Sequence, residues 1–197
     1  MVSIFFMSVV ITILLTPGPT NTLLAASGIQ IGIQKSLKLI PAEVLGYVIA
    51  ISVWGVLIKA MSGSMPWLPV VLKLLSAAFI LVLAVRLWKT STKPLDLEQP
   101  TIAPKALFVA TLFNPKAFMF ATLVFPEHSW LVVQQFVLHM GTFVMLIIPI
   151  AFLWIAFGYL LVKNRISWLN QCNLQRFASL ILVFFSIPLT ISALSSL

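Results

Sequence analysis

The sequence predicts an all-α membrane protein with six transmembrane helices, arranged as two inverted three-helix halves whose first helices are broken by proline. Three observations lead to this fold class. The chain of 197 residues is 61% hydrophobic and only 8% charged, whereas a soluble domain carries about a quarter charged residues. Its apolar runs reach the length of about 20 residues that crosses hydrocarbon. Each predicted half has three spans, and an odd number of spans forces the halves into opposite orientations.

The elements follow in order along a single transmembrane domain, residues 1–197. The expected spans cover about 2–33, 41–58, 68–87, 106–125, 136–162 and 177–193. The first is longer than a simple span because Thr16-Pro17-Gly18-Pro19-Thr20-Asn21 divides it. Asn114-Pro115-Lys116 interrupts the fourth, at the corresponding position of the second half. The start of the fifth span is uncertain, since the run 131–162 is too long for one upright helix.

The net charge of +8 predicts orientation rather than nucleic-acid binding. Basic residues gather in the first, third and fifth loops: Lys35, Lys38, Arg86, Lys89, Lys93, Lys105, Lys163, Arg165 and Arg176. Loops with an excess of Lys and Arg stay cytoplasmic, so both termini are expected outside. The N-terminus has no basic n-region, which favours a retained span over a signal peptide. The single Cys172 excludes an internal disulfide.

The first break is a functional-site hypothesis. Proline and glycine are the poorest residues for a helix interior, and broken backbone at membrane depth is tolerated only where protein buries it or where it lines a cavity. A new half-helix is expected to begin at Gly18-Pro19 or Thr20, with Asn21 in its first turn. The alternative is a packing kink, as expected at Pro149 and Pro188.

The second break reads as the start of a half-helix, because Asn is a strong N-cap and proline is favoured at the first helical position. The N–H groups and dipole of such an end favour an anion, and Lys116 adds a positive charge. Two half-helix ends from opposite halves would seat a carboxylate. The predicted substrate-binding residues are Pro17, Gly18, Pro19, Thr20, Asn21, Asn114, Pro115 and Lys116.

Glu43 has two open interpretations. Inside the membrane it would bind a substrate ammonium, pair with Lys116 or carry a proton, since intramembrane acids are functional candidates. At the cytoplasmic interface it would pair with Lys35 or Lys38. His128 is expected in a loop and His139 as a packing residue. The sequence lacks enzyme motifs and metal-ligand clusters, so no enzyme activity, cofactor or metal is expected.

The two motifs, Thr16 to Asn21 and Leu112-Phe113-Asn114-Pro115-Lys116-Ala117, resemble the LysE/RhtB family of amino-acid exporters along nearly the whole chain. The Pro-Gly-Pro-x-Asn form looks closest to the branch exporting cysteine and O-acetylserine. Departures at Thr20 and at Pro41-Ala42-Glu43 bear on the substrate rather than on the fold.

This resemblance implies a bacterial inner-membrane exporter of small amino acids or their derivatives, driven by the proton gradient. Its expected partners are the amino acid, protons and the lipid bilayer, with assembly into a homo-oligomer left open. Two alternatives stand beside it. A non-transporting membrane scaffold would have its breaks filled by neighbouring side chains. An intramembrane enzyme would need a partner for a serine such as Ser27, Ser52 or Ser76, and small hydroxyls in spans more often pack between helices.

Overall fold

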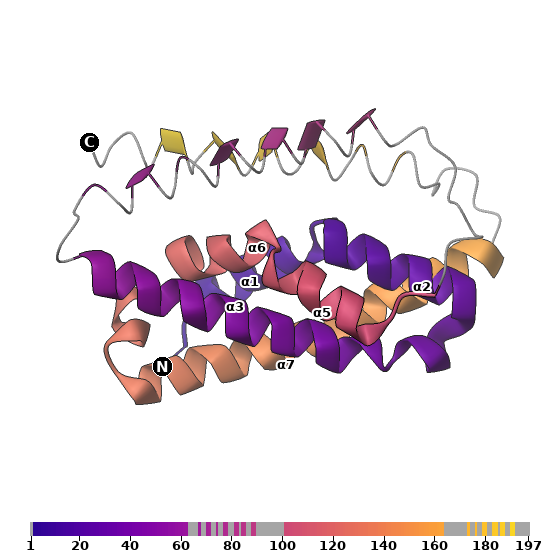
Figure 1. Ribbon diagram of the computed structural model, residues 1–197, viewed down its shortest axis with the longest axis horizontal. Coiled ribbons are helices and arrows are strands. Elements are labelled where there is room, and N and C mark those ends of the chain that lie inside the picture. Colours follow the sequence, from indigo (N-terminus) through magenta and orange to yellow (C-terminus); the bar gives the residue numbers. More distant parts are fainter. Residues whose placement is uncertain are drawn as a thin grey trace.

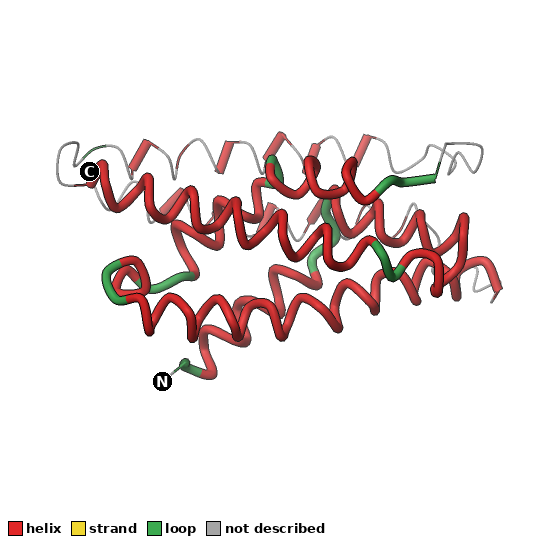
Figure 2. Tube along the Cα trace, turned by 60° about the horizontal axis from the view of Figure 1, so that its bottom comes forward, coloured by secondary structure: helices red, strands yellow, loops and turns green. Residues whose placement is uncertain are grey.

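The computed structural model describes residues 2–62 and 101–163, and separate residues within 67–89 and 173–191. The regular elements in these described residues are helices. They are α1 (Ile4–Leu15), α2 (Pro19–Ser36), α3 (Leu39–Ser62), α5 (Pro104–Leu112), α6 (Pro115–Met119), the π-helix η1 (Phe120–Val124), the 3-10 helix η2 (Glu127–Trp130) and α7 (Val133–Lys163). Figures 1 and 2 show the helices lying side by side along the long axis of the molecule.

Two described helices are long and apolar enough to cross a membrane, Leu39–Ala60 and Val133–Leu161. Two bent pairs pass the same test together: α1 with α2, bent by 58°, and α5 with Pro115–Val124, bent by 44°. The described part therefore holds two spans, or four if each bent pair is one span. The expected third and sixth spans, 68–87 and 177–193, fall largely outside the described residues, so two inverted halves of three helices stay a prediction.

Helix boundaries differ from the sequence prediction where proline stands near a helix start. The helix α3 begins at Leu39 and places Pro41 in its first turn, and α5 begins at Pro104 itself. Proline is tolerated there because the N–H it lacks would have no partner inside the helix. The helix α7 begins at Val133, a little before the expected start of the fifth span at residue 136.

Large apolar side chains point outward from the described helices. Phe5, Phe113 and Met145 are exposed by 78%, 80% and 77% of their surface. Large exposed apolar surfaces mark contacts with proteins or membranes, and contact with lipid chains accounts for these side chains. Together with the long apolar helices, it makes the chain a multi-pass membrane protein.

Glycines bring α2 and α7 into backbone contact. A Cβ atom on Gly28 would lie 2.1 Å from the Ile155 carbonyl oxygen, and one on Gly158 would lie 2.0 Å from the Ala25 carbonyl oxygen. Small residues at a helix interface allow this approach, and dispersion contacts then hold the helices together in lipid. Each helix thus contributes one glycine against which the backbone of the other helix packs. We call this pair, Gly28 and Gly158, the clamp.

A third glycine, Gly32, ends the straight part of α2. Its φ of 76° and ψ of 174° lie in a region that is essentially restricted to glycine. The chain turns there before Ser36, whose Oγ donates to the Gly32 carbonyl oxygen at 2.7 Å. The helix α2 continues past this kink and ends at Ser36, beyond the predicted end of the first span at residue 33.

The clamp predicts that Gly28→Ala and Gly158→Ala each destabilise the protein. The added methyl group would collide with fixed backbone, which costs about 1–3 kcal/mol or more when a packed interface must move. Thermal unfolding in detergent, followed by size-exclusion chromatography, measures the loss. Gly141→Ala on α7 is the matched control, because a Cβ there meets nothing within 4 Å. Equal melting temperatures for all three variants would contradict the clamp.

Candidate functional site

The first break ends α1 at Thr16 and begins α2 at Pro19, as predicted. Thr16 is extended, with φ −63° and ψ 127°, because the ring of the following Pro17 disfavours the helical region for the residue before it. Gly18 is the N-cap of α2 and gives it no side-chain cap. The N-terminal end of α2 thus stands directly beside the C-terminal end of α1.

Side chains, rather than backbone, satisfy the carbonyl groups that the break releases. Asn21 Nδ2 donates to the Leu14 carbonyl oxygen at 2.8 Å and to the Thr16 carbonyl oxygen at 2.9 Å. The Lys116 ammonium, from the second break, also donates to the Thr16 carbonyl oxygen. Asn21 and Lys116 are 4% and 2% exposed. A cation and an amide donor are the groups that the negative end of a helix prefers.

Gly18 gives Lys116 its path to that carbonyl. A Cβ atom on Gly18 would lie 3.0 Å from Lys116 Cε and 3.3 Å from Nζ. The aliphatic stem of the lysine therefore lies across the glycine. Close approach explains the glycine here, since its φ of −165° is open to any residue.

The second break begins α6 with Asn114 as N-cap and Pro115 at the first position, which confirms the sequence prediction. Asn114 Oδ1 accepts from the Lys116 backbone N–H at 3.0 Å. Its Nδ2 donates to Thr20 Oγ1 at 3.1 Å and to the Tyr47 hydroxyl at 2.9 Å. One side chain thus caps α6 and connects it to α2 and α3.

Glu43 completes the polar cluster. Its side chain is 1% exposed and lies close enough to Thr20 and Lys116 to interact electrostatically with both. The Oε2 atom has no hydrogen-bond partner. Of the two interpretations, the structure supports the one inside the protein, beside Lys116, over pairing with Lys35 or Lys38 at the interface.

We call this group the break cluster. It consists of Thr16, Thr20, Asn21, Glu43, Tyr47, Asn114 and Lys116. The predicted site residues Gly18, Thr20, Asn21, Asn114 and Lys116 come together in or against it. Pro17, Pro19 and Pro115 shape the backbone around it. The first residues of α2 and of α6 lie near the middle of the long axis of the molecule (Figure 1).

Tyr47 is the member that sequence reasoning missed. It is 1% exposed and stands four residues after Glu43 on α3, so both project from the same helix face. A carboxyl and a phenol at that spacing in an apolar helix were the available signal. The ring of Tyr47 also packs edge-to-face against Phe120 and Phe143, with centroids 6.0 Å and 5.7 Å away. Aromatic side chains thus close one side of the cluster.

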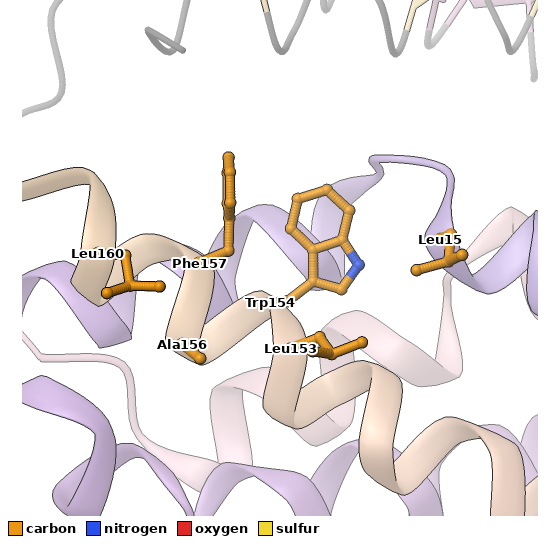
Figure 3. A pocket seen from close by; sticks show the side chains of 6 residues that line it. All are labelled: Leu15, Leu153, Trp154, Ala156, Phe157 and Leu160. Atoms are coloured by element: carbon orange, nitrogen blue, oxygen red, sulfur yellow. The ribbon is translucent and has the colours of Figure 1, made fainter. Parts of the chain in front are cut away.

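A separate apolar groove of about 360 Å³ lies between the end of α1 and α7 (Figure 3). Leu15, Leu153, Trp154, Ala156, Phe157 and Leu160 line it. Its wall offers almost no polar surface, so it suits an alkyl chain rather than a charged amino acid. The break cluster is instead packed by its own side chains.

The two histidines lie apart from the break cluster. His139 is 2% exposed, and its Nδ1 lies 2.8 Å from the Gln135 carbonyl oxygen and 3.2 Å from Ser129 Oγ. It is the packing residue that the sequence predicted. His128 stands in η2 rather than in an irregular loop, because Glu127–Trp130 forms a 3-10 turn. Among the residues that the structure describes, no three His, Cys, Asp or Glu side chains gather to hold a metal ion.

Broken helices that join charged groups inside an apolar helical protein are typical of membrane transporters. The sequence matches the family model of the LysE type translocator over residues 11–193, so the chain belongs to that family. It is a membrane transporter of amino acids or related substances, and the resemblance read from the two motifs is confirmed. No curated protein and no solved structure matches the chain.

The caps of α1 predict that Asn21→Asp lowers stability. The change keeps the shape of the side chain but removes both N–H donors. Thr16 keeps its bond from Lys116, whereas the Leu14 carbonyl loses its side-chain donor, and a buried carbonyl without a donor costs about 1–3 kcal/mol. Thermal unfolding in detergent gives the difference. Thr22→Val is a matched control on the same helix, because the Thr22 hydroxyl bonds only within its own turn, to the Gly18 carbonyl oxygen. A loss no larger than that of the control would refute the capping role.

Proposed function

We propose that the protein exports small amino acids or their derivatives across a bacterial inner membrane, coupled to the proton gradient, and that the break cluster is the substrate seat. One observation carries this proposal. The two helix breaks, nearly a hundred residues apart, meet in a single buried cluster that contains a carboxyl group and an ammonium group. A zwitterionic amino acid has the complementary pair of charges.

Each end of the substrate has its partners in this scheme. The carboxylate would sit at the N-terminal ends of α2 and α6, where the helix dipole attracts anions, with Lys116 supplying a full positive charge. Glu43 would take the ammonium group or a proton. Both charged residues lie where water is scarce, and such groups are retained in membranes mainly for function.

The ends of the described helices support the proposed orientation. The turn between α2 and α3 and the end of α7 lie at one end of the molecule in Figure 1, and the N-terminus and η2 lie at the other. The first of these ends carries Lys35 and Lys38 beside the α2–α3 turn. The positive-inside rule would place it in the cytoplasm and the N-terminus outside.

A non-transporting scaffold is the second candidate, favoured by one observation. Asn21 and Lys116 fill the first break in the described structure, as the scaffold hypothesis expects. Efflux of radiolabelled amino acids from loaded vesicles separates the two, with a panel that includes cysteine, O-acetylserine, alanine, leucine and lysine. Export of at least one compound above empty vesicles supports a transporter, and none above background supports the scaffold.

We predict that Lys116→Gln and Asn21→Ala strongly reduce this export while the protein stays in the membrane. Losing a charge-assisted hydrogen bond of about 1.5–3 kcal/mol lowers the export rate by roughly 10-fold to 150-fold. Initial rates per inserted protein measure the effect. Lys59→Gln is the matched control, since Lys59 Nζ also donates to a backbone carbonyl, that of Trp130 at 2.8 Å, but at an exposed position. Normal export by Lys116→Gln and Asn21→Ala would remove the break cluster from the substrate seat.

Proton coupling predicts that a protonophore collapses uphill export, and that Glu43→Gln exports only downhill. The amide has the size of the carboxyl group but exchanges no proton at physiological pH. Export against a concentration gradient, measured with an imposed pH difference, tests both statements. Glu127→Gln is the control because Glu127 is exposed in η2. Uphill export by Glu43→Gln with the wild-type pH dependence would show that another group carries the proton.

A further inference from the structure

The Lys116 ammonium group occupies a position with unusual chemistry. It donates to the Thr16 carbonyl oxygen, at the C-terminal end of α1. A primary ammonium has three donors and no acceptor, and the end of a helix dipole that attracts cations is the C-terminal one. The α-ammonium group of an amino acid has the same three donors and the same charge. The end of α1 is therefore chemically suited to bind either one.

The position offers more acceptors than Lys116 uses. Glu43 interacts electrostatically with Lys116, and its Oε2 atom is buried without a hydrogen-bond partner. A buried carboxyl oxygen without a donor is costly, and such a group marks a site that a further donor would complete. Thr16, at the end of α1, thus accepts a hydrogen bond from this cation, and Glu43 on α3 lies close enough to act on it electrostatically.

Lys116 contacts the Thr16 carbonyl oxygen through its side chain, so this hydrogen bond can break while the helix backbone stays in place. Its stem lies across Gly18, and its backbone is held separately, because the Lys116 N–H caps α6 through Asn114 Oδ1 at 3.0 Å. Rotation about the side-chain bonds would withdraw the ammonium group without breaking this backbone bond. If a backbone N–H group donated to the Thr16 carbonyl oxygen instead, the helix that carries it would have to unfold before the bond could break.

We propose that the Thr16 carbonyl oxygen and the Glu43 carboxyl group form a primary-ammonium subsite, and that Lys116 occupies this subsite as a tethered stand-in when no substrate is bound. The second part rests on the proposed function. An arriving amino acid places its ammonium group on Thr16 and Glu43, and the released Lys116 meets the substrate carboxylate. A substrate must then carry both an ammonium group and a carboxylate. The ammonium group replaces that of Lys116 on the subsite, and the carboxylate gives the released Lys116 a new partner.

Vacating the subsite tests the proposal without any transport. The variant Lys116→Ala removes the side chain beyond Cβ, and n-propylammonium has the atoms that are lost. Thermal unfolding of purified protein in detergent is measured with n-propylammonium, with propan-1-ol and with tetramethylammonium, which is a cation without N–H donors. At ten times its Kd, n-propylammonium is expected to raise the melting temperature of Lys116→Ala by roughly 3–6 °C. The two other compounds are expected to leave it unchanged.

Wild type and Lys59→Ala are the protein controls. Wild type is expected to show no rise because Lys116 fills the subsite, and Lys59→Ala none because its vacated carbonyl bond is exposed to water. No rise for Lys116→Ala, or an equal rise with tetramethylammonium, would overturn the subsite. An equal rise in wild type would overturn the occupancy by Lys116.

A second variant covers the case in which Lys116→Ala does not fold. Lys116→Met keeps a stem of nearly the same length and lacks only the ammonium group, so the ammonium ion itself fits the vacancy. Ammonium chloride is then expected to raise its melting temperature above that in equal sodium chloride, and equal values would overturn the proposal. These readouts are independent of export. A positive melting shift without vesicle export would retain the subsite and reject the proposed function, and export without the shift would do the reverse.

Discussion

The structure depends on what happens to the carbonyl groups at the end of α1. Thr16-Pro17-Gly18-Pro19 stops one helix and starts another inside an apolar protein, where no bulk water can donate hydrogen bonds to the freed carbonyl groups. Asn21 donates to two of these carbonyl oxygens, and Lys116, which is 100 residues from Thr16 in the sequence, donates to one of them. The remedy for a local break is thus a long-range contact. That contact fixes the second break against the first and gathers the break cluster.

The contact from Lys116 also places charge in the break cluster, because Glu43 is buried there as well. A carboxyl group and an ammonium group buried together lose hydration that their mutual attraction only partly returns, so such a pair is weak evidence for stability. An uncharged amide at residue 116 could donate to the same carbonyl at lower cost. The presence of both Glu43 and Lys116 is better explained by a task that needs charge, and a transported zwitterion or proton supplies one.

The helices α2 and α7, in contrast to the polar break cluster, are held together by close backbone packing. Gly28 and Gly158 allow the backbones of α2 and α7 to touch, so that part of the molecule has little room for adjustment. The bonds at the break are side-chain bonds, which exchange partners by rotation. A rigid helix pair beside exchangeable caps is the combination that a binding site within a membrane helix requires, because the site can change state while the helices stay folded.

Local chemistry explains what the sequence determined by itself. Proline, glycine and asparagine, acting on adjacent backbone, determine the two breaks, the start of α2 at Pro19 and the Asn114 cap, and these effects need no distant partner. The family was predicted from the two motifs that contain these residues. Only the tertiary structure decided the burial of Glu43, the entry of Tyr47 into the cluster and the bond between Lys116 and Thr16. One helical turn along α3 separates a buried carboxyl group from an interfacial one, and a lysine stem is long enough to reach several partners. Packing of α1, α2, α3 and α6 against one another removes that freedom, because it places one particular carbonyl within reach of the ammonium group.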